Sequence, residues 1–309
     1  MKYSELIFYL IVILLLYYVY DLYCKSHATI ENFEDKYEQT EKYEDIYDKE
    51  FVDFYNIIYN ESKTHNEVTK IISNEISHKN DPQILVIGSN CGHLLKSLKT
   101  KYKHVTGLDK SEWMLKKCHS IHPYIKTIKA DISKDNLFET STYDVIIFES
   151  STLNQNNEKN IKKILKNIHS YLKENGILIC PIYEEKTLNP RPRYYTTNYI
   201  DTKKNIHGFT YLNDFNHDCY YIKRNEKDSN GHFNFDYFDK IVLKSKKHRI
   251  KKTPLYIPEK EDYYEIIISR GFDIKKIYDL DELSGLIVYE LAFFKKKNVK
   301  ININDLEKK

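Results

Sequence analysis

The chain has 309 residues, enough for one large domain with an appendage and a substantial core. Its net charge of +3 is nearly neutral and gives no global electrostatic argument for binding nucleic acid. The five cysteines include no C-x-x-C pair and are odd in number, which argues against a disulfide framework or a zinc site. We therefore predict reduced thiols and no metal.

An apolar, uncharged segment, Leu6–Tyr20, lies near the N-terminus. With Tyr3 and Tyr23 included, its length approaches that needed to cross a hydrocarbon core of roughly 30 Å. Tyrosines gathered at one end are typical of a membrane interface. We predict a single-pass membrane anchor over residues 1–24, with the rest of the chain facing the cytosol. A cleaved signal peptide, with Ser26-His27-Ala28 as its cleavage site, and a buried core helix are the alternatives.

Residues 25–80 form a polar, acidic segment whose apolar positions recur at helical spacing. Two helices are predicted, joined near Asn60–Asn66, and Asp81-Pro82 ends the second. The apolar faces comprise Phe51, Phe54, Tyr55, Ile58 and Tyr59 in the first helix, and Val68, Ile71, Ile72 and Ile76 in the second.

Strands and helices alternate over residues 81–183, which predicts a parallel, doubly wound sheet. The last helix is expected to end in a left-handed cap at Asn175-Gly176. The predicted strands are 84–87, 105–108, 125–130, 143–148 and 177–180, and the predicted helices are 92–101, 113–120 and 161–172.

Residues 184–258 break this alternation and predict a β-rich antiparallel insertion that forms a substrate lid. Its strands are expected at Cys219–Lys223, Phe233–Phe238 and Ile241–Leu243, around a turn at Asp228–Gly231. Residues 259–297 then complete the core with a helix over 259–270, a cap at Gly271, and strands at 272–277 and 286–294. Residues 298–309 are a tail. The basic run Lys240–Lys252 is interpreted as a solvated outer strand, with an anionic partner as the alternative.

The start of the core has the layout of a βαβ nucleotide-binding half. An apolar strand, Ile84–Ile87, enters a turn at Gly88–Gly92, and the next strand ends on Asp109. Glycines let a backbone approach a ligand closely, and a carboxylate at that position can accept from two ribose hydroxyls. The match to G-x-G-x-x-G is incomplete, so the surrounding residues decide which nucleotide binds.

The order of motifs resembles that of class I S-adenosylmethionine-dependent methyltransferases of the small-molecule type. The resemblance covers residues 81–183 and extends over 259–295. Two positions depart from the family pattern: Val86 replaces an acid, and Asn90 replaces the middle glycine of the turn. Asn is the residue besides Gly that best tolerates a positive φ, so the turn is expected to form. The matching segments are Leu85–Gly92, Gly107–Ser111, Ala130–Ile132, Tyr143–Ile146, Leu172–Ile177 and Gly271-Phe272.

This resemblance implies a Rossmann-like, seven-stranded fold and S-adenosylmethionine as the cofactor. It implies that Asp109 binds the ribose, that Asp131 and Ile132 read the adenine, and that Trp113 and Met114 wall it. The backbone at Gly88 and Gly92 is expected to approach the methionine part. The full predicted set of cofactor-binding residues is Tyr47, Gly88, Ser89, Asn90, Gly92, Asp109, Lys110, Trp113, Met114, Asp131, Ile132 and Glu149.

The chemistry implied is methyl transfer to an unidentified acceptor: a small molecule, a lipid or a protein side chain. Glu149 is the candidate catalytic residue, because it follows the fourth strand, where a side chain can orient or deprotonate a substrate. His207, His217, Tyr220 and Tyr221 are candidate lid contacts. Glu149–Thr152 lacks the Asn/Asp-Pro-Pro-aromatic motif, which argues against amino-directed DNA methylation, and no nucleic-acid partner is expected.

Two other functions remain open from the sequence. A catalytically inactive, membrane-tethered module that binds S-adenosylmethionine or a partner fits the replacements Val86 and Asn90. An NAD(P)-dependent enzyme fits the βαβ layout, but the turn lacks the third glycine and no Tyr-x-x-x-Lys motif follows Asp131.

Overall fold

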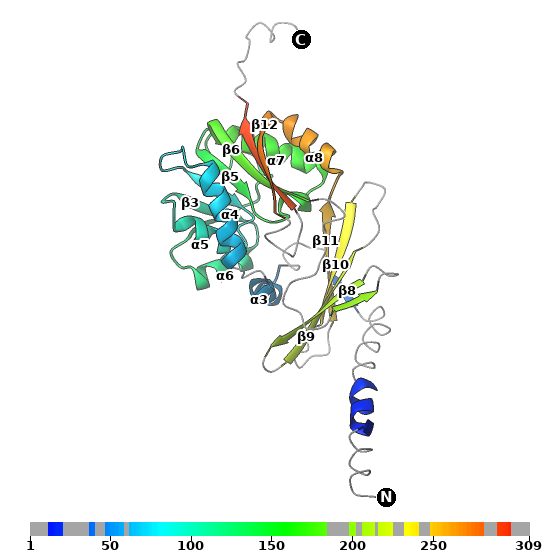
Figure 1. Ribbon diagram of the computed structural model, residues 1–309. Helices are drawn as coiled ribbons and strands as arrows, with labels where there is room; N and C mark the ends of the chain where they lie inside the picture. The colour runs from blue at the N-terminus through cyan, green and yellow to red at the C-terminus, as the bar shows by residue number, and fades with distance from the viewer. Residues whose placement is uncertain are drawn as a thin grey trace, which may run out of the picture.

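Two sheets organise the chain (Figure 1). One has seven strands with helices on both faces, and the other has six strands and lies beside it. The computed structural model describes residues 12–20, 37–40, 47–58, 62–183, 198–201, 206–213, 216–224, 232–240, 248–280 and 289–297.

The seven-stranded sheet has the order β12-β13-β6-β5-β2-β3-β4. Its five strands from β6 to β4 run parallel, and β13 pairs antiparallel with both β6 and β12. The predicted parallel sheet is therefore confirmed, and the two strands predicted to complete the core pair antiparallel at its edge. The strands are β2 (Ile84–Ile87), β3 (Val105–Asp109), β4 (Lys126–Lys129), β5 (Tyr143–Phe148), β6 (Leu172–Tyr183), β12 (Phe272–Asp279) and β13 (Tyr289–Lys296).

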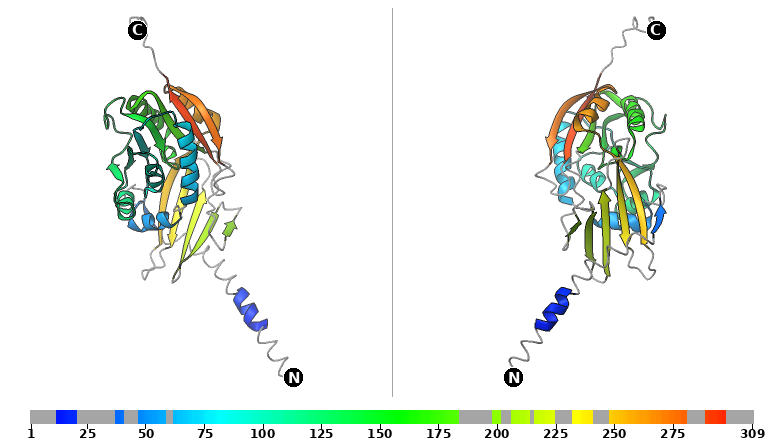
Figure 2. Two further views of the ribbon diagram at one scale, coloured as in Figure 1. Left: turned by 60° about the vertical axis from the view of Figure 1, so that its left-hand side comes forward. Right: turned by 90° about the vertical axis from the view of Figure 1, so that its right-hand side faces the viewer.

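Helices cover both faces of this sheet, as Figure 2 shows. Side chains alternate along β2, so that Leu85 and Ile87 enter one core cluster while Ile84 and Val86 enter the other. This alternation explains why the strand is apolar at every position. The helices are α3 (Lys49–Ile58), α4 (Ser62–Glu75), α5 (His93–Lys99), α6 (Glu112–Ile121), α7 (Glu158–Tyr171) and α8 (Lys260–Ile268), with a 3₁₀ turn η1 (Leu153–Gln155).

Helix α7 differs from its prediction at both ends. It begins at Glu158, where the Asn157 side chain accepts a hydrogen bond from the Asn160 N–H and caps the first turn. It ends at Tyr171, because Leu172 is already extended. Asn175 does adopt a left-handed conformation, with φ of 57°, but it lies within β6, so the predicted cap at Asn175-Gly176 was wrong.

The six-stranded sheet has the order β1-β11-β10-β9-β8-β7 and is antiparallel except that β1 pairs parallel with β11. Two predicted strands correspond to β9 and β10, whereas Ile241–Leu243 and the turn at Asp228–Gly231 lie outside the described residues. Strand β1 comes from the acidic segment that was predicted to be helical. The strands are β1 (Tyr37–Thr40), β7 (Asn198–Asp201), β8 (Ile206–Asn213), β9 (Asn216–Arg224), β10 (His232–Lys240) and β11 (His248–Tyr256).

Residues 12–20 of the apolar N-terminal segment are helical. The side chains from Ile13 to Tyr20 are 57–69 % exposed. None of the helices in the described part of the chain has the length and apolar character needed to cross a membrane. Residues 1–11 and 21–24 of the predicted anchor lie outside the described residues.

Candidate functional site

The turn after β2 contains three residues in the left-handed region: Gly88 (φ 69°), Asn90 (φ 47°) and Gly92 (φ 83°). Asn90 takes the positive φ that the family pattern gives to a glycine, so the turn forms as predicted. The N–H groups of Gly88 and Ser89 both donate to the Leu108 carbonyl, at 2.8 and 3.1 Å. These bonds tie the turn to the end of β3.

The two glycines of the turn make room for the chain's own side chains. A Cβ at Gly88 would lie 1.9 Å from Thr152 Oγ1, and a Cβ at Gly92 would lie 2.4 Å from Cys118 Sγ. The sequence predicts that both glycines let the backbone approach a ligand, and it gives no sign of this packing. Each glycine thus has a structural function that is independent of any ligand.

Asp109 is fixed at the end of β3. Its carboxyl is buried, with Oδ2 accepting from the Asn90 N–H at 2.9 Å and Oδ1 from the Ser111 N–H at 2.8 Å. Burial raises the pKa of Asp109, and hydrogen bonds from backbone N–H groups, together with the charge of Lys110, oppose that rise. A carboxylate has about four acceptor positions, so each oxygen keeps capacity for a ligand hydroxyl.

Glu149 follows β5 on the other side of β2, and its N–H donates to the Ile87 carbonyl at 2.9 Å. Its side chain is buried, and Oε2 has no hydrogen-bond partner among the described residues. Oε1 lies 3.8 Å from Nε2 of His65, which α4 contributes. Burial raises the pKa of Glu149 well above its usual range, and the negative charge of Asp109 adds to the shift.

Two other buried polar atoms on the turn have no hydrogen-bond partner within the described residues: Ser89 Oγ and Asn90 Nδ2. Buried polar groups are normally paired, so the unpaired Glu149 carboxyl and Asn90 amide beside one turn indicate a place for a polar ligand, whereas Ser89 Oγ packs over Gly107 next to Leu95. An amide and a carboxyl together offer both donors and acceptors. This set fits a ligand that carries hydroxyl, amino and carboxylate groups.

Tyr47 connects the two sides of this site. Its hydroxyl accepts a hydrogen bond from Gln155 Nε2 at 2.8 Å, while its carbonyl accepts one from Ser111 Oγ at 3.5 Å. Its ring packs edge-on against Phe51, with 5.4 Å between the centroids. The structure therefore brings Tyr47 to the same edge of the sheet as the turn and Asp109.

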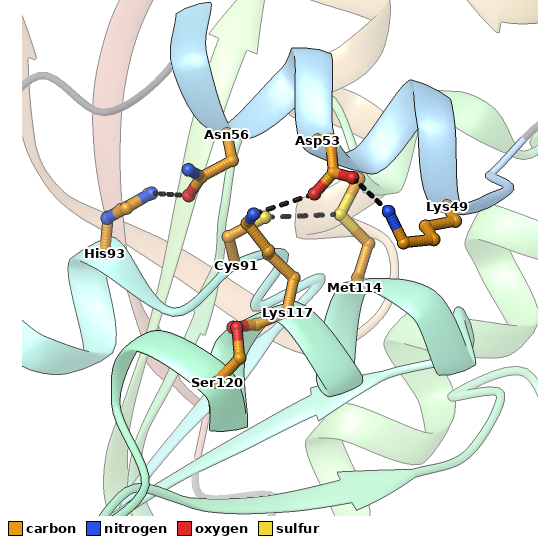
Figure 3. Close-up of polar contacts among 8 residues, drawn as sticks. All are labelled: Lys49, Asp53, Asn56, Cys91, His93, Met114, Lys117 and Ser120. Carbon is orange, nitrogen blue, oxygen red and sulfur yellow. Dashed lines mark hydrogen bonds and ion pairs between the residues drawn. The ribbon is translucent and has the colours of Figure 1, made fainter.

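Helix α3 lies across the turn and is held by polar contacts to two helices (Figure 3). Asp53 Oδ1 pairs with Lys117 Nζ of α6 at 2.7 Å, and Asn56 Oδ1 accepts from His93 Nε2 of α5 at 2.9 Å. Beneath α3, the thiol of Cys91 lies 3.7 Å from the Met114 sulfur. The contacts make α3 a cover over the turn.

The remaining predicted residues lie around α6 and the end of β4. Met114 is buried in a cluster under α3, whereas Trp113 is 38 % exposed and has Lys116 Nζ 4.5 Å above its ring. Lys110 is exposed between Asp109 and α6. The two side chains therefore lie in different surroundings, although the sequence predicts that both line the adenine.

Asp131 and Ile132 follow β4. Asp131 Oδ1 accepts from the Ser133 N–H at 2.9 Å; burial raises its pKa, but the hydrogen bonds from Ser133 outweigh this and leave the pKa below its usual value. The carbonyl of Ile132 accepts from Asn167 Nδ2 at 3.2 Å. Both residues lie at the same edge of the sheet as Asp109.

These features define a class of protein: a doubly wound parallel sheet whose ligand site lies at the carboxyl ends of adjacent strands, around a left-handed turn. A family model described as "Methyltransferase domain" matches residues 84–176. This segment spans the turn, Asp109, Asp131 and Glu149. Residues 84–176 thus match a methyltransferase domain, in agreement with the class predicted from the sequence.

Solved structures share the fold over most of the chain. A S-adenosylmethionine-dependent methyltransferase from Clostridium acetobutylicum is 17 % identical, with a TM-score of 0.60, over 81 % of this chain and 98 % of that one. An amino pentose methyltransferase from Micromonospora echinaspora, involved in calicheamicin biosynthesis and solved with S-adenosylmethionine bound, is 14 % identical, with a TM-score of 0.56, over 77 % and 96 %.

A sugar N-methyltransferase from a Streptoalloteichus species is 11 % identical, with a TM-score of 0.59, over 80 % of this chain and 92 % of that one. At these identities the likeness concerns the fold, and it confirms the Rossmann-like, seven-stranded architecture. A search of curated proteins finds no significant match.

Proposed function

We propose that this chain transfers a methyl group from S-adenosylmethionine to an acceptor. The observation that carries the proposal is the buried Asp109 carboxylate. Two backbone N–H groups hold it at the carboxyl end of β3, in the segment that matches a methyltransferase domain. Asp109 is placed to accept from two ribose hydroxyls. The unpaired polar atoms of Asn90 and Glu149 fit the methionine portion of the same molecule.

When bound, S-adenosylmethionine would supply a methyl group on a sulfonium sulfur: a lone pair of the acceptor would form the new bond to carbon in line with the breaking S–C bond, and S-adenosylhomocysteine would leave with that bond's electron pair. The residues of this chain bind the methyl donor and exclude water. Asp109 orients the ribose, Asp131 accepts from the adenine amino group, and Tyr47 with α3 closes the site from above. The acceptor is a small molecule, a lipid or a protein side chain, approaching from the six-stranded sheet.

We favour an active enzyme over the inactive module. Val86 is fully buried in the core cluster that includes Ile72 of α4, so its side chain serves packing. Asn90 adopts the left-handed conformation that the turn requires. Neither replacement distorts the turn, and we propose an active enzyme.

Calorimetric titration with S-adenosylmethionine, S-adenosylhomocysteine and NAD tests this function. We expect heat from the first two ligands and none from NAD. Binding of NAD alone would contradict the proposal and favour a dehydrogenase. Transfer of a labelled methyl group from S-adenosylmethionine to amine, hydroxyl, lipid or protein acceptors then identifies the acceptor class, and binding without transfer to any of them supports the inactive module.

We also propose that residues 1–24 anchor the chain in a membrane, with the methyltransferase domain on the cytosolic side. The apolar composition of Leu6–Tyr20 and the exposed side chains of helical residues 13–20 support this. The full chain should float with lipid vesicles after alkaline carbonate washing, whereas a chain starting at residue 25 should stay in the aqueous fraction. Equal behaviour of the two would contradict the anchor.

A further inference from the structure

Asp109 and Glu149 flank the turn after β2 at the same level of the sheet. In the strand register, Ile87 lies opposite both Leu108 of β3 and Phe148 of β5. Each acid therefore stands beside Gly88, about 9–10 Å from the other along the two strand spacings. A ligand whose ribose lies at Asp109 extends across the turn toward Glu149.

Among the described residues, the groups that face Glu149 come from α4, β3, α6 and the turn after β2. His65 of α4 lies 3.8 Å from Oε1, a distance beyond hydrogen-bond range, and Asp109 of β3 acts on it through its charge. The thiol of Cys91, in the turn, and that of Cys118, on α6, are close enough for the charge of Glu149 to act on them. Burial raises the pKa of the Cys91 thiol and raises that of Cys118 to about 12, so both are uncharged near neutral pH.

Within the described part of the chain, the surroundings of Glu149 offer little to stabilise its ionised form: His65 lies near Oε1 and would pair with it only when protonated. A buried carboxylate needs hydrogen-bond donors or a cation, because removing it from water is costly. Among the described residues, Oε2 has no donor. Burial and Asp109 raise the pKa of Glu149, so the free protein holds the proton of that carboxyl more tightly than an exposed glutamate would.

We propose that Glu149 receives the ammonium group of the cofactor's methionine portion and releases its proton to solvent when that group binds. The inference rests on the proposed function, since it requires S-adenosylmethionine as the ligand. An ammonium brings three N–H donors and one positive charge, which are the two things that Oε2 lacks. The proton balance is simple: the ammonium stays protonated, the carboxyl ionises, and one proton passes to the buffer.

The test compares two ligands that share adenine and ribose. S-adenosylhomocysteine carries the ammonium group, whereas 5′-methylthioadenosine lacks the amino acid portion. Calorimetry of the full chain in two buffers of different ionisation enthalpy, from pH 5.5 to 8, measures protons released per ligand bound. We expect S-adenosylhomocysteine to release up to one proton and to bind more tightly as pH rises, and 5′-methylthioadenosine to do neither.

Variants assign the proton to its residue. Glu149→Gln should weaken S-adenosylhomocysteine about tenfold to a hundredfold and abolish proton release. The same variant should change the affinity for 5′-methylthioadenosine less than about twofold. His65→Gln should retain proton release, because His65 is a neighbour of Glu149 and is not the group that binds the ammonium.

The outcomes separate this inference from the proposed function. Absence of binding by S-adenosylmethionine and S-adenosylhomocysteine would overturn the proposed function itself. Binding without proton release, or unchanged affinity in Glu149→Gln, would overturn only the ammonium assignment and would leave Glu149 as a base for the acceptor. Proton release that is lost in His65→Gln and kept in Glu149→Gln would transfer the titrating role to His65.

Discussion

The ends of β3 and β5 present two buried carboxyl groups in contrasting surroundings. Both oxygens of Asp109 accept a backbone N–H, whereas Oε2 of Glu149 has no partner among the described residues. Burial raises the pKa of both, but only Glu149 is shifted well above its usual range. The difference indicates that the fold itself holds Asp109 ready as an acceptor, while Glu149 requires something from outside the chain.

Gly88, which lies between the two acids, provides the largest expected effect. Gly88→Ala places a methyl group 1.9 Å from Thr152 Oγ1 at a φ of +69°. Backbone strain of about 1–3 kcal/mol and overpacking of about 1–3 kcal/mol should together lower the free energy of unfolding by roughly 2–6 kcal/mol. Chemical denaturation measures this loss.

Ser89→Ala is the matched control in the same turn. It removes a buried hydroxyl that has no hydrogen-bond partner among the described residues, so the free energy of unfolding should change by less than about 1 kcal/mol. If Gly88→Ala were as stable as Ser89→Ala, the packing of Thr152 against the turn would not be as the structure has it.

Asp109→Ala should have the next largest effect, on cofactor binding. Hydrogen bonds to a charged group contribute about 1.5–3 kcal/mol, so affinity for S-adenosylhomocysteine should fall at least tenfold and up to about 150-fold. Calorimetry measures the affinity, and circular dichroism checks that the fold is kept. Asp135→Ala, which removes an exposed acid after β4, is the control and should bind normally. Unchanged affinity in Asp109→Ala would remove the ribose assignment.

The Asp109 side of the site could be predicted from the sequence, because it depends on residues that follow one another closely along the chain. An apolar strand, a turn with glycines and an acid at the end of the next strand are all within 26 residues, 84–109, and the backbone connects them directly. The tolerance of Asn90 for a positive φ is likewise an intrinsic property of the residue, and the structure bears it out.

The Glu149 side could be predicted only in part. Glu149 was a candidate because it follows a strand, but its neighbour His65 comes from a helix 84 positions earlier, and no local pattern joins them. The contacts of Gly88 with Thr152 and of Gly92 with Cys118 depend on how α6 and the β5 loop pack. The left-handed Asn175 shows the same limit: its conformation was foreseen, but its place in β6 depends on strand pairing.

The pH dependence of the free protein's stability tests the surroundings of Glu149. A raised pKa means that the folded state holds the Glu149 proton more tightly than the unfolded state does. Stability should therefore fall as pH rises from about 4.5 toward the raised pKa of Glu149. Glu149→Gln removes this decline. At neutral pH the variant should therefore gain roughly 1 kcal/mol in free energy of unfolding, which raises its midpoint of thermal unfolding by a few degrees above that of the wild type. Parallel curves for both proteins between pH 5 and 8 would contradict the burial of an ionisable Glu149.

The smallest expected effect concerns helix α3, which covers the turn near Asp109. Lys117→Met removes the ion pair that joins α6 to Asp53 of α3, a half-exposed contact that contributes up to about 1 kcal/mol. Lys49→Met is the matched control, because Lys49 pairs with the same Asp53 from within α3 and does not tie the helix to the core. Amide hydrogen exchange should become several-fold faster in α3 of Lys117→Met and stay unchanged in α7, while the control shows the wild-type rates in both. Equal exchange in the two variants would mean that the hydrogen bond from His93 to Asn56 and the packing of Phe51 hold the cover without the ion pair.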